Sequence, residues 1–325
     1  MIGPGGDAAV VRIRGTDRAI ALKTDCNGRY AFLDPREGAK IAVAEAARNV
    51  ACAGGRPMAI TNNLNFGNPK RPEVYFQLRE AVGGMKEACE ALGTPVTGGN
   101  VSLYNENPTG AVYPTPVIGM VGLVDSLTHV TRSAFTTPGD AIVLLGENTD
   151  ELGGSEYLAR IHDAVAGRPP HCDLARERAV IAALLEAIRD GTVRSAHDCA
   201  DGGLATALAE CVMMERAQPT SARVDLSTWR SLPRRALLFG EAQGRVIVST
   251  PDPEAVLAIA ARQGVPARRI GEVMPATSPF TIVLDGGSLA IPVSALADAY
   301  HETIPRVMSR TASAQDVALA SDSQV

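Results

Sequence analysis

The chain has 325 residues, of which 46% are hydrophobic, with a single Trp, six Phe and a net charge of −5. This length allows two domains with aliphatic cores, and the acidic balance argues against an unspecific nucleic-acid binder, which needs clustered Lys and Arg. No apolar run approaches the roughly 20 residues that span a bilayer, and the N-terminus lacks a secretory signal. The six cysteines form no Cys-x-x-Cys pair, so we expect reduced thiols in a cytoplasmic enzyme or part of one.

The first part of the chain alternates between strand and helix patterns. The expected elements are strands over 8–13 and 19–25, a helix from 35 to about 50, a short strand over 58–61, a helix over 72–92 and a strand over 117–124. Asp34 is a typical N-cap with Pro35 in the first turn, and Gly93 suits the C′ position of the long helix.

A polar stretch near residues 126–138, rich in turn formers, separates two predicted units, 1–130 and 131–308, before a tail over 309–325 that we expect to be disordered. The expected elements of the second unit are a strand over 141–145, a helix over 176–190, a loop over 196–203, a helix over 204–214, a strand over 245–249 and a helix over 253–263. Strands alternating with helices, interrupted by hairpin-like pairs, predict an α/β or α+β sandwich.

Two polar segments follow predicted buried strands. Residues 62–69 hold four asparagines, and the next such segment offers Gly98 and Gly99, then Asn100 and Ser102. We interpret the glycines as a backbone nest for an anion and the two side chains as neutral ligands for Mg²⁺ and phosphate. Asn-rich and Gly-rich stretches are also ordinary turns, so a structural turn is the alternative.

Lys23 and Asp25 are two residues apart on a predicted strand and therefore point to the same face. Such a pair can place an ammonium near phosphate and a carboxylate near Mg²⁺, although a salt bridge at the strand end is the simpler interpretation. In the second unit, residues 201–203 either present N–H groups to an anion or only cap a helix. Glu241 and Gln243 suit an exposed turn, and His197 has no partner typical of catalysis.

Taken in their order along the chain, these segments resemble the synthetase subunit of phosphoribosylformylglycinamidine synthase, an enzyme of purine biosynthesis. The resemblance covers nearly all of residues 1 to about 308 and rests on residues 3–10, 23–27, 63–69, 97–106, 197–204 and 239–241. The family subunit is about twice this length and has two homologous halves, and this chain is similar to the second, C-terminal half only.

The resemblance implies that the catalytic histidine lies elsewhere. The first half of the family carries a Lys-x-Glu-x-His segment, and Asn27 stands where that histidine would be, so we expect no catalytic residue in this chain. Met1 falls just before the glycine-rich opening of the second half, as if translation or gene calling began inside a longer protein.

The resemblance also implies a reaction and its ligands. ATP activates the amide oxygen of formylglycinamide ribonucleotide as an iminophosphate, and ammonia from a partner glutaminase displaces phosphate. Asn62 and Gly99 would contact ATP, Asn100 would bind Mg²⁺, and Ser102 would contact the substrate. Many family members have Asp at the position of Asn62, whose neutral amide can still hydrogen-bond the nucleotide but supplies no carboxylate.

Lys23 and Asp25 would belong, by the same resemblance, to a second and non-catalytic nucleotide site. The implied fold is an N-terminal mixed sheet with helices, as in aminoimidazole ribonucleotide synthetase, followed by a C-terminal α/β sandwich with ferredoxin-like elements. The N-terminal sheet would pair into a barrel shared with the N-terminal half of the synthase, which would protect its edge.

Two other functions stay open. One is a non-catalytic nucleotide-binding or scaffolding module, homodimeric through its exposed sheet edge. The other is an independent ATP-dependent kinase or synthetase of the same superfamily, acting on thiamine phosphate or selenide. The second is disfavoured because such enzymes carry acidic Mg²⁺ clusters, whereas this chain has Asn62, Asn63 and Asn65.

Overall fold

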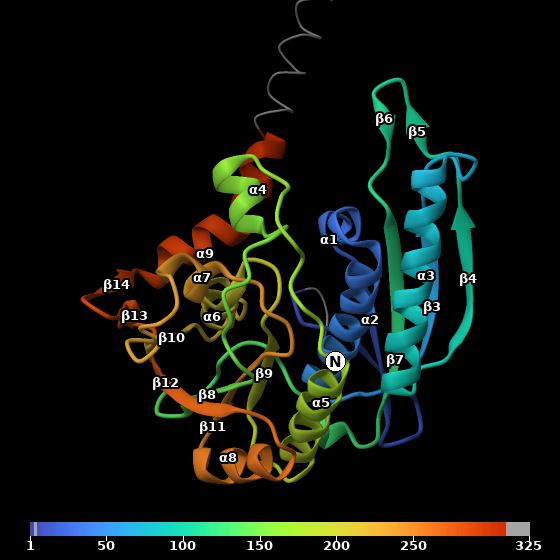
Figure 1. Ribbon diagram of the computed structural model, residues 1–325. Coiled ribbons are helices and arrows are strands. Elements are labelled where there is room, and N and C mark those ends of the chain that lie inside the picture. Colours follow the sequence, from blue (N-terminus) through green and yellow to red (C-terminus); the bar gives the residue numbers. More distant parts are fainter. Residues whose placement is uncertain (3–4, 310–325) are drawn as a thin grey trace, which may run out of the picture.

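The computed structural model describes residues 1–2 and 5–309, and the chain is built around two mixed β-sheets (Figure 1). The first sheet has five strands in the order β1-β2-β7-β3-β4. They are β1 (Ala9–Arg12), β2 (Ala19–Asp25), β3 (Arg56–Asn65), β4 (Val96–Ser102) and β7 (Thr115–Val124). A small hairpin, β5 (Glu106–Asn107) and β6 (Gly110–Ala111), extends beyond it. Gly3 and Pro4 of the glycine-rich opening, and the predicted tail from residue 310 onward, lie outside the described residues.

Three helices cover one face of the first sheet: α1 (Gly28–Leu33), α2 (Pro35–Cys52) and α3 (Pro72–Leu92). Helix α2 begins as predicted, because the Asp34 side chain accepts hydrogen bonds from the backbone of Arg36 and Glu37. Helix α3 ends as predicted at Gly93, which adopts a left-handed φ of 67°. Helix α2 is buried along most of its length, because it is enclosed by the sheet, α3 and the second part of the chain.

The opposite face of this sheet, which we call the outer face, is open to solvent. Alternating residues of the paired strands point to it, and an apolar stripe runs across β1, β2 and β7. Val11 is 57% exposed and Leu22 47% exposed, although both are strand residues of apolar type. The sheet is therefore one layer that lacks a covering layer on the outer face among the described residues.

The second sheet has seven strands in the order β14-β13-β10-β12-β8-β11-β9. They are β8 (Ala141–Leu145), β9 (Ser195–Asp198), β10 (Thr220–Asp225), β11 (Val246–Thr250), β12 (Ala267–Pro275), β13 (Phe280–Leu284) and β14 (Gly287–Ile291). The helices of this part are η1 (Leu127–His129), α4 (Glu156–His162), α5 (Leu174–Arg189), α6 (Gly203–Met213), α7 (Arg234–Phe239), α8 (Pro253–Arg262) and α9 (Val293–His301). None of the helices in the described part of the chain is long and apolar enough to cross a bilayer.

Helices pack on both faces of the second sheet, which confirms the predicted sandwich. Val143 and Leu145 of β8 join the core that contains α5 and α8, while Ile142 and Leu144 join the core that contains α6 and α7. Every residue of β8 is therefore buried, which explains why this strand is a continuous apolar run.

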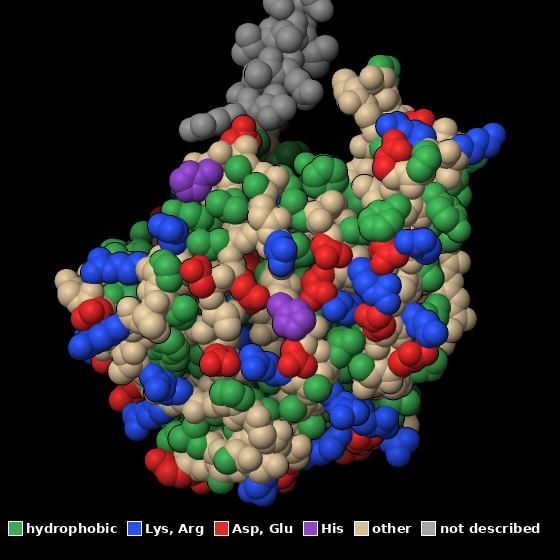
Figure 2. Space-filling view, in the orientation of Figure 1, with side chains coloured by type: hydrophobic (Ala, Val, Ile, Leu, Met, Phe, Trp, Pro, Cys, Tyr) green, Lys and Arg blue, Asp and Glu red, His purple; other side chains and the backbone are tan. Residues whose placement is uncertain are grey.

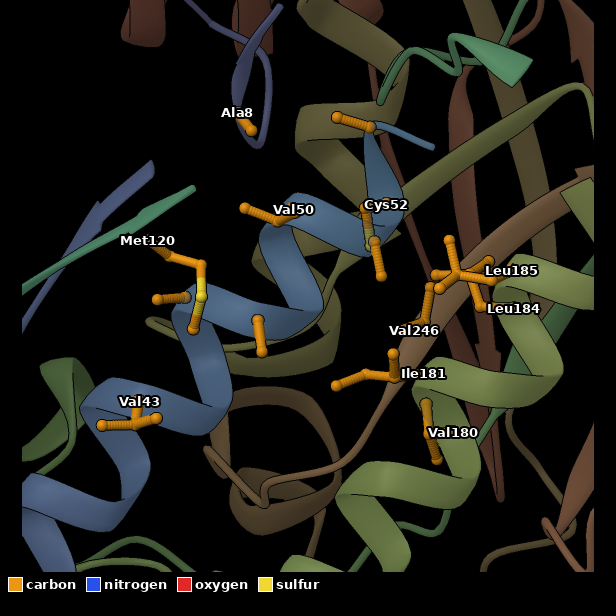
Figure 3. Packing of buried hydrophobic residues seen from close by; sticks show 14 of the residues in the cluster. Ala8, Val43, Val50, Cys52, Met120, Val180, Ile181, Leu184, Leu185 and Val246 are labelled. Atoms are coloured by element: carbon orange, nitrogen blue, oxygen red, sulfur yellow. The ribbon is translucent and has the colours of Figure 1, made fainter. Parts of the chain in front are cut away.

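The core around α2 and α5 belongs to both sheets (Figure 3). It contains Val43 and Val50 of α2 and Met120 of the first sheet, together with Val180 of α5 and Val246 of the second sheet. Figure 2 shows that on the face seen in Figure 1 acidic and basic side chains are interspersed. The two sheets therefore share one close-packed apolar core.

Two segments expected as loops continue strands instead. β3 runs on through residues 62–65 because it pairs with β7 on one side and β4 on the other, so ladder hydrogen bonds override the turn preference of Asn. The same pairing draws Gly98 and Gly99 into β4. Residues 196–198, also expected as loop, form β9 against β11.

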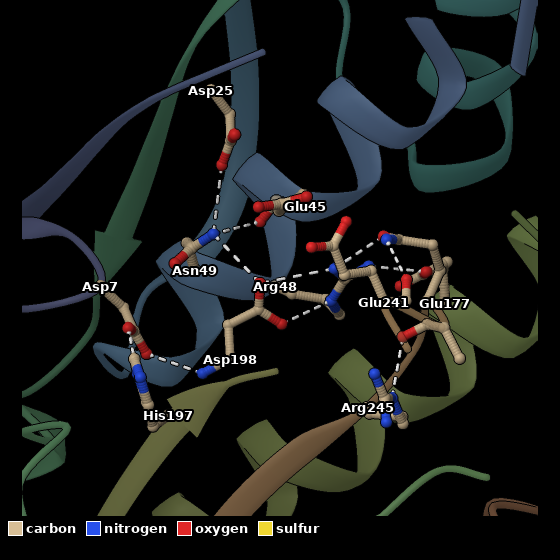
Figure 4. Close-up of polar contacts among 12 residues, drawn as sticks. Asp7, Asp25, Glu45, Arg48, Asn49, Glu177, His197, Asp198, Glu241 and Arg245 are labelled. Atoms are coloured by element: carbon tan, nitrogen blue, oxygen red, sulfur yellow. Dashed lines mark hydrogen bonds and ion pairs between the residues drawn. The ribbon is translucent and has the colours of Figure 1, made fainter. Parts of the chain in front are cut away.

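A buried ion cluster joins the two parts of the chain (Figure 4). The Arg48 side chain of α2 is 0% exposed, and its guanidinium donates to Asp198 of β9 at 2.7 Å and to Glu177 of α5 at 2.6 Å. Arg48 also donates to the Gln243 side chain at 2.9 Å. Asn49 adds hydrogen bonds to Asp198 at 3.3 Å and to Asp25 of β2 at 3.2 Å. The cluster thus fixes α2 to both sheets and to α5.

We expect Arg48→Ala to lower the free energy of unfolding by about 3–5 kcal/mol, because two carboxylates would stay buried without their counter-charge. Urea titration followed by circular dichroism measures the change. Arg178→Ala is the matched control, since Arg178 is exposed on α5 and should change the free energy by less than about 0.5 kcal/mol. Equal losses in both variants would contradict the assignment.

Candidate functional site

The candidate residues of the first sheet lie on two different faces. Register places Asp25 opposite Ile118, Ile118 opposite Asn62 and Asn62 opposite Gly99, so one row crosses the sheet from β2 to β4. This row faces the helices, because Ile118 is buried at 0% exposure. Asp25 and Gly99 are three strand spacings apart, about 14 Å. The candidate nucleotide-binding residues therefore share one face of the sheet, but Asp25 and Gly99 are too far apart to contact each other.

Asn100 and Ser102 belong to the outer face. Asn100 is in register with Asn63, and its side-chain amide donates to the Asn63 side-chain oxygen at 3.2 Å. Ser102 is in register with Asn65, and its hydroxyl lies 3.1 Å from the side-chain nitrogen of Asn105. The outer face at β3 and β4 thus carries neutral amide and hydroxyl groups beside the apolar stripe.

The predicted anion nest at Gly98 and Gly99 is wrong. Neither glycine is among the residues with positive φ, and both are extended residues of β4, so their N–H groups do not converge on one point. Gly99 is required for another reason. A Cβ at this position would lie 2.0 Å from the Asn62 side-chain oxygen and 2.7 Å from the Asn62 carbonyl oxygen. The absence of a side chain at Gly99 lets Asn62 lie across the edge strand.

Lys23 and Asp25 form the expected ion pair, at 3.8 Å, on the helix-facing side of β2. Their surroundings are acidic, because Glu45, Asp198 and Asp201 all act on the pKa of Asp25 or Lys23. Burial raises the pKa of Asp25 to about 7, while Lys23 opposes the shift. Burial likewise raises the pKa of Glu45 well above its ordinary value. Asp25, with a pKa near neutrality, is therefore the carboxyl group of this pair that can take up a proton close to pH 7.

Glu241 was expected in an exposed turn, but in the structure it is buried. It is 0% exposed and accepts hydrogen bonds from the backbone of Gly202 at 2.7 Å and of Glu156 at 2.8 Å, and from the Tyr30 hydroxyl. Burial raises the pKa of Glu241 to about 7, against the effect of these donors. The N-terminus of α6 thus has its anion within the chain, and Asp201 accepts from the Asn27 side chain at 3.0 Å.

His197 is a buried residue with two acidic partners that its sequence context does not reveal. Its ring lies between Asp7, at 2.6 Å from Nδ1, and Glu210, at 3.0 Å from Nε2. Burial lowers the pKa of His197, but the Asp7 carboxylate and then Glu210 raise it to about 10. Asp7 also accepts from the backbone of Asp198 at 3.1 Å. The partner Asp7 is 190 residues away, so no local spacing could have revealed this pair.

No group of three or more His, Cys, Asp and Glu side chains within residues 1–2 and 5–309 is arranged to hold a metal ion. Around Asn100 the available ligands are the side-chain oxygens of amides and a hydroxyl, without a carboxylate among its hydrogen-bond partners. Mg²⁺ in proteins is held through one or two carboxylates together with substrate phosphates. These residues fit one side of a Mg²⁺–phosphate group, and the remaining ligands have to come from elsewhere.

Comparison with known proteins matches both parts of the chain. The AIR synthase related protein N-terminal domain matches residues 5–124, and the C-terminal domain of the same description matches residues 137–283. The chain is 49% identical over 314 residues to the phosphoribosylformylglycinamidine synthase subunit PurL of Moorella thermoacetica, which covers 95% of this chain and 42% of that protein. The chain therefore spans about two fifths of the length of this curated relative.

Solved structures of PurL from Thermotoga maritima share the fold. The complex with FGAR has a TM-score of 0.75 and 22% identity, over 90% of this chain and 48% of that one. The complex with ATP has a TM-score of 0.72 and 24% identity, over 91% and 47%. The structure of PurLQS gives 0.72 and 22%, over 89% and 46%.

Gly99→Ala is expected to lower the free energy of unfolding by about 1–3 kcal/mol, because the new methyl group overlaps Asn62 and must displace β4. Gly98→Ala is the matched control in the same strand, since its added Cβ has nothing within 4 Å. Chemical denaturation of both variants makes the comparison. Equal stability of the two would show that Asn62 does not depend on the missing side chain.

The His197 pair generates a pH dependence with a definite sign. Because the folded-state pKa of about 10 exceeds the ordinary value of 6.5, the stability it contributes is complete below pH 6.5 and is lost as pH rises toward 10. We expect the difference in free energy of unfolding between the wild type and His197→Gln to shrink over this range. His162→Gln, at an exposed position, is the control and should give a difference that is flat with pH. A flat difference for His197→Gln would refute the assignment.

Proposed function

The chain belongs to the AIR synthase related family, and from this premise we propose that it is the second, C-terminal half of the synthetase subunit of a phosphoribosylformylglycinamidine synthase. On this proposal, ATP phosphorylates the amide oxygen of formylglycinamide ribonucleotide, and ammonia displaces phosphate to give the amidine with ADP and phosphate. The reaction takes place in the cytoplasm, and a glutaminase subunit supplies the ammonia. The proposal rests on the family match and on the part of the relative that the chain spans.

The outer face of the first sheet carries this proposal. It places two polar groups suited to ligand binding, Asn100 and Ser102, beside an apolar stripe that contains Leu22 and Val11. A solvent-exposed apolar sheet face with polar ligands at its margin fits a layer that completes a shared site with a second sheet. The N-terminal half of the synthase is the partner we assign to this face, and the two sheets would then close the shared barrel.

We assign the binding of the nucleotide to the edge strand β4. It is an edge strand, so a ligand along its free edge reaches both Asn62 and Gly99 on one face and Asn100 on the other. Asn62 would hydrogen-bond ATP through its amide, and Gly99 would let the backbone approach it closely. Ser102 lies two residues after Asn100 on β4 and on the same outer face. It would hydrogen-bond the phosphate or ribose of the substrate.

Mg²⁺ is the metal we assign to Asn100, whose amide nitrogen donates to Asn63 and which would bind the ion through its side-chain oxygen. This oxygen would be one neutral ligand to a metal ion that is also held by nucleotide phosphates and by carboxylates of the partner half. When bound, the ion offsets the negative charge of the phosphates.

Lys23 and Asp25 are proposed to belong to a second, non-catalytic nucleotide site. Lys23 is the cation that would face phosphate there. Glu45, Asp198 and Asp201 lie close enough to perturb this pair, so phosphate would enter only with protons or cations that offset their charge.

Reconstitution tests the proposed activity. We expect the purified chain alone to give no ADP release that depends on formylglycinamide ribonucleotide and ammonia, because the catalytic histidine is on the other half. Addition of a matching N-terminal half should restore turnover, measured by a coupled ADP assay. Turnover by the chain alone would overturn the half-enzyme proposal, and binding without turnover in the mixture would favour the nucleotide-binding or scaffolding module.

Three variants separate association from chemistry in this assay. Leu22→Glu should prevent association on gel filtration, because it places a charge in the apolar stripe. Ser102→Ala should leave association intact and lower kcat/KM by about tenfold or more, since one hydrogen bond to a charged substrate is lost. Ser288→Ala, on the exposed edge strand β14, is the matched control and should change neither. Unchanged kinetics in Ser102→Ala would refute its role.

A further inference from the structure

The turn after β4 holds the hydroxyl of Ser102 in a network of hydrogen bonds. This turn leads from the end of β4 into the hairpin formed by β5 and β6 (Figure 1). The Asn105 side chain folds back over it, so that its nitrogen lies 2.9 Å from the Ser102 carbonyl oxygen and 3.1 Å from the Phe66 carbonyl oxygen. The Ser102 hydroxyl lies 3.2 Å from the Asn105 side-chain oxygen. Asn105 therefore contacts the hydroxyl group that the proposed function assigns to the substrate.

Tyr104 gives this turn its shape, because its backbone is left-handed with a φ of 62°. Such a φ is uncommon for a bulky residue, and the ring is 55% exposed, so burial of the ring does not explain it. The backbone is held instead by the segment after β3. Tyr104 N–H donates to the Gly67 carbonyl at 2.9 Å, and Asn105 N–H donates to the Phe66 carbonyl at 3.1 Å. These bonds offset the unfavourable φ, and the result is that Asn105 lies against Ser102.

The hydrogen atoms of this network follow from a count of donors and acceptors. The Asn105 amide nitrogen carries two hydrogens, and both carbonyl oxygens beside it can only accept. The opposite orientation of the amide would bring its oxygen against both carbonyls, so the network fixes which atom is the nitrogen. Both amide hydrogens therefore point to carbonyls, although Ser102 Oγ also lies 3.1 Å from the nitrogen. The hydroxyl hydrogen of Ser102 then points to Asn105 Oδ1, and Ser102 Oγ faces a ligand as an acceptor.

Asn65 is in register with Ser102 on the neighbouring strand and is arranged in a similar way. Its side-chain nitrogen donates to the carbonyl oxygens of Asn63 at 3.1 Å and of Thr115 at 3.5 Å. Within residues 1–2 and 5–309, no donor lies within hydrogen-bond distance of the Asn65 side-chain oxygen. Neighbouring strands are about 4.8 Å apart. The outer face thus has two hydrogen-bond acceptors side by side, at Ser102 and Asn65.

We propose that Ser102 and Asn65 bind the two hydroxyl groups of the substrate ribose, and that Asn105 is the positioning residue that makes Ser102 an acceptor. This inference rests on the proposed function, and it narrows the contact of Ser102 from phosphate or ribose to ribose. A phosphate group offers acceptor oxygens and negative charge, which do not match two acceptors of the protein. Each ribose hydroxyl has a hydrogen to donate, so two neighbouring hydroxyls match two neighbouring acceptors.

Neutron diffraction from crystals of the full chain grown in D₂O tests the hydrogen positions without a ligand. We expect the Ser102 deuteron between Oγ and Asn105 Oδ1, and both Asn105 Nδ2 deuterons directed at carbonyl oxygens. A Ser102 deuteron directed away from Asn105 would overturn the inference, whatever reaction the protein catalyses.

Substrate analogues test the ribose contact in the mixture with the N-terminal half. Inhibition constants are measured in the wild type and Ser102→Ala for formylglycinamide riboside, which lacks the phosphate, and for the 2′-deoxy and 3′-deoxy ribonucleotides. Ser102→Ala should weaken binding of the riboside about tenfold, because the hydroxyl contact remains in the wild type. With one of the two deoxy forms the loss should fall below about twofold, since the donor is absent. Asn65→Ala should show the same dependence on the other deoxy form.

Two results of this assay contradict the proposal. A loss in Ser102→Ala that persists with both deoxy forms overturns the ribose contact, and a loss that disappears with the riboside assigns Ser102 to the phosphate instead. If the wild-type mixture gives no turnover, the proposed function fails, and the neutron experiment then decides on the arrangement of Ser102 separately.

Asn105→Ala tests the positioning role. It leaves the Ser102 hydroxyl free to rotate, so Ser102→Ala should cost less in this background than in the wild type, and a double-mutant cycle measures the difference. Asn107→Ala is the matched control, since the Asn107 side chain accepts from Thr109 in the adjacent hairpin. It should leave the cost of Ser102→Ala unchanged. Equal costs in all three backgrounds would show that Asn105 does not position the hydroxyl, and the neutron and analogue measurements do not require these variants to fold.

Discussion

The buried guanidinium of Arg48 is the interaction on which the arrangement of this chain depends. It lies where α2, α5 and β9 meet, and its charge is offset by Asp198 and Glu177, which come from the other part of the chain. Two buried carboxylates without it would be strongly unfavourable, so the two sheets are held together by a pairing as well as by their shared apolar core. Such a pairing specifies one relative orientation, whereas apolar contact alone tolerates sliding.

This junction leaves the first sheet with two unlike faces. The helix-facing side carries Asp25 and Asn62 in a row that ends at Gly99, and the outer face carries Asn100 and Ser102 beside exposed apolar residues. Because side chains alternate along a strand, neighbours in sequence serve opposite faces. Because β4 is an edge strand, both of these sets of residues lie near one free edge of the sheet. On the proposed function, the open apolar face and the neutral polar groups beside it would both be covered by a second sheet layer.

Electrostatics divides the buried polar residues into two kinds. Glu241 and His197 satisfy groups within the chain, namely the N-terminus of α6 and the carboxylate of Asp7. Glu177 keeps one oxygen without a partner. Buried polar atoms are nearly always paired in folded proteins, and this oxygen is one of several exceptions among the described residues.

The sequence by itself determined the elements whose signals are local. The N-cap Asp34, the C′ Gly93 and the apolar run of β8 predict their helices and strand because caps and hydrophobic patterns act within a few residues. The motifs, taken in their order along the chain, were likewise sufficient to indicate the family. Only the tertiary structure decided that the segments around Asn62 and Gly99 are paired strands, since their ladder partners come from distant parts of the chain. Contacts between residues far apart in sequence produce no local sequence pattern. These contacts decide on which face of the sheet each candidate ligand-binding residue lies.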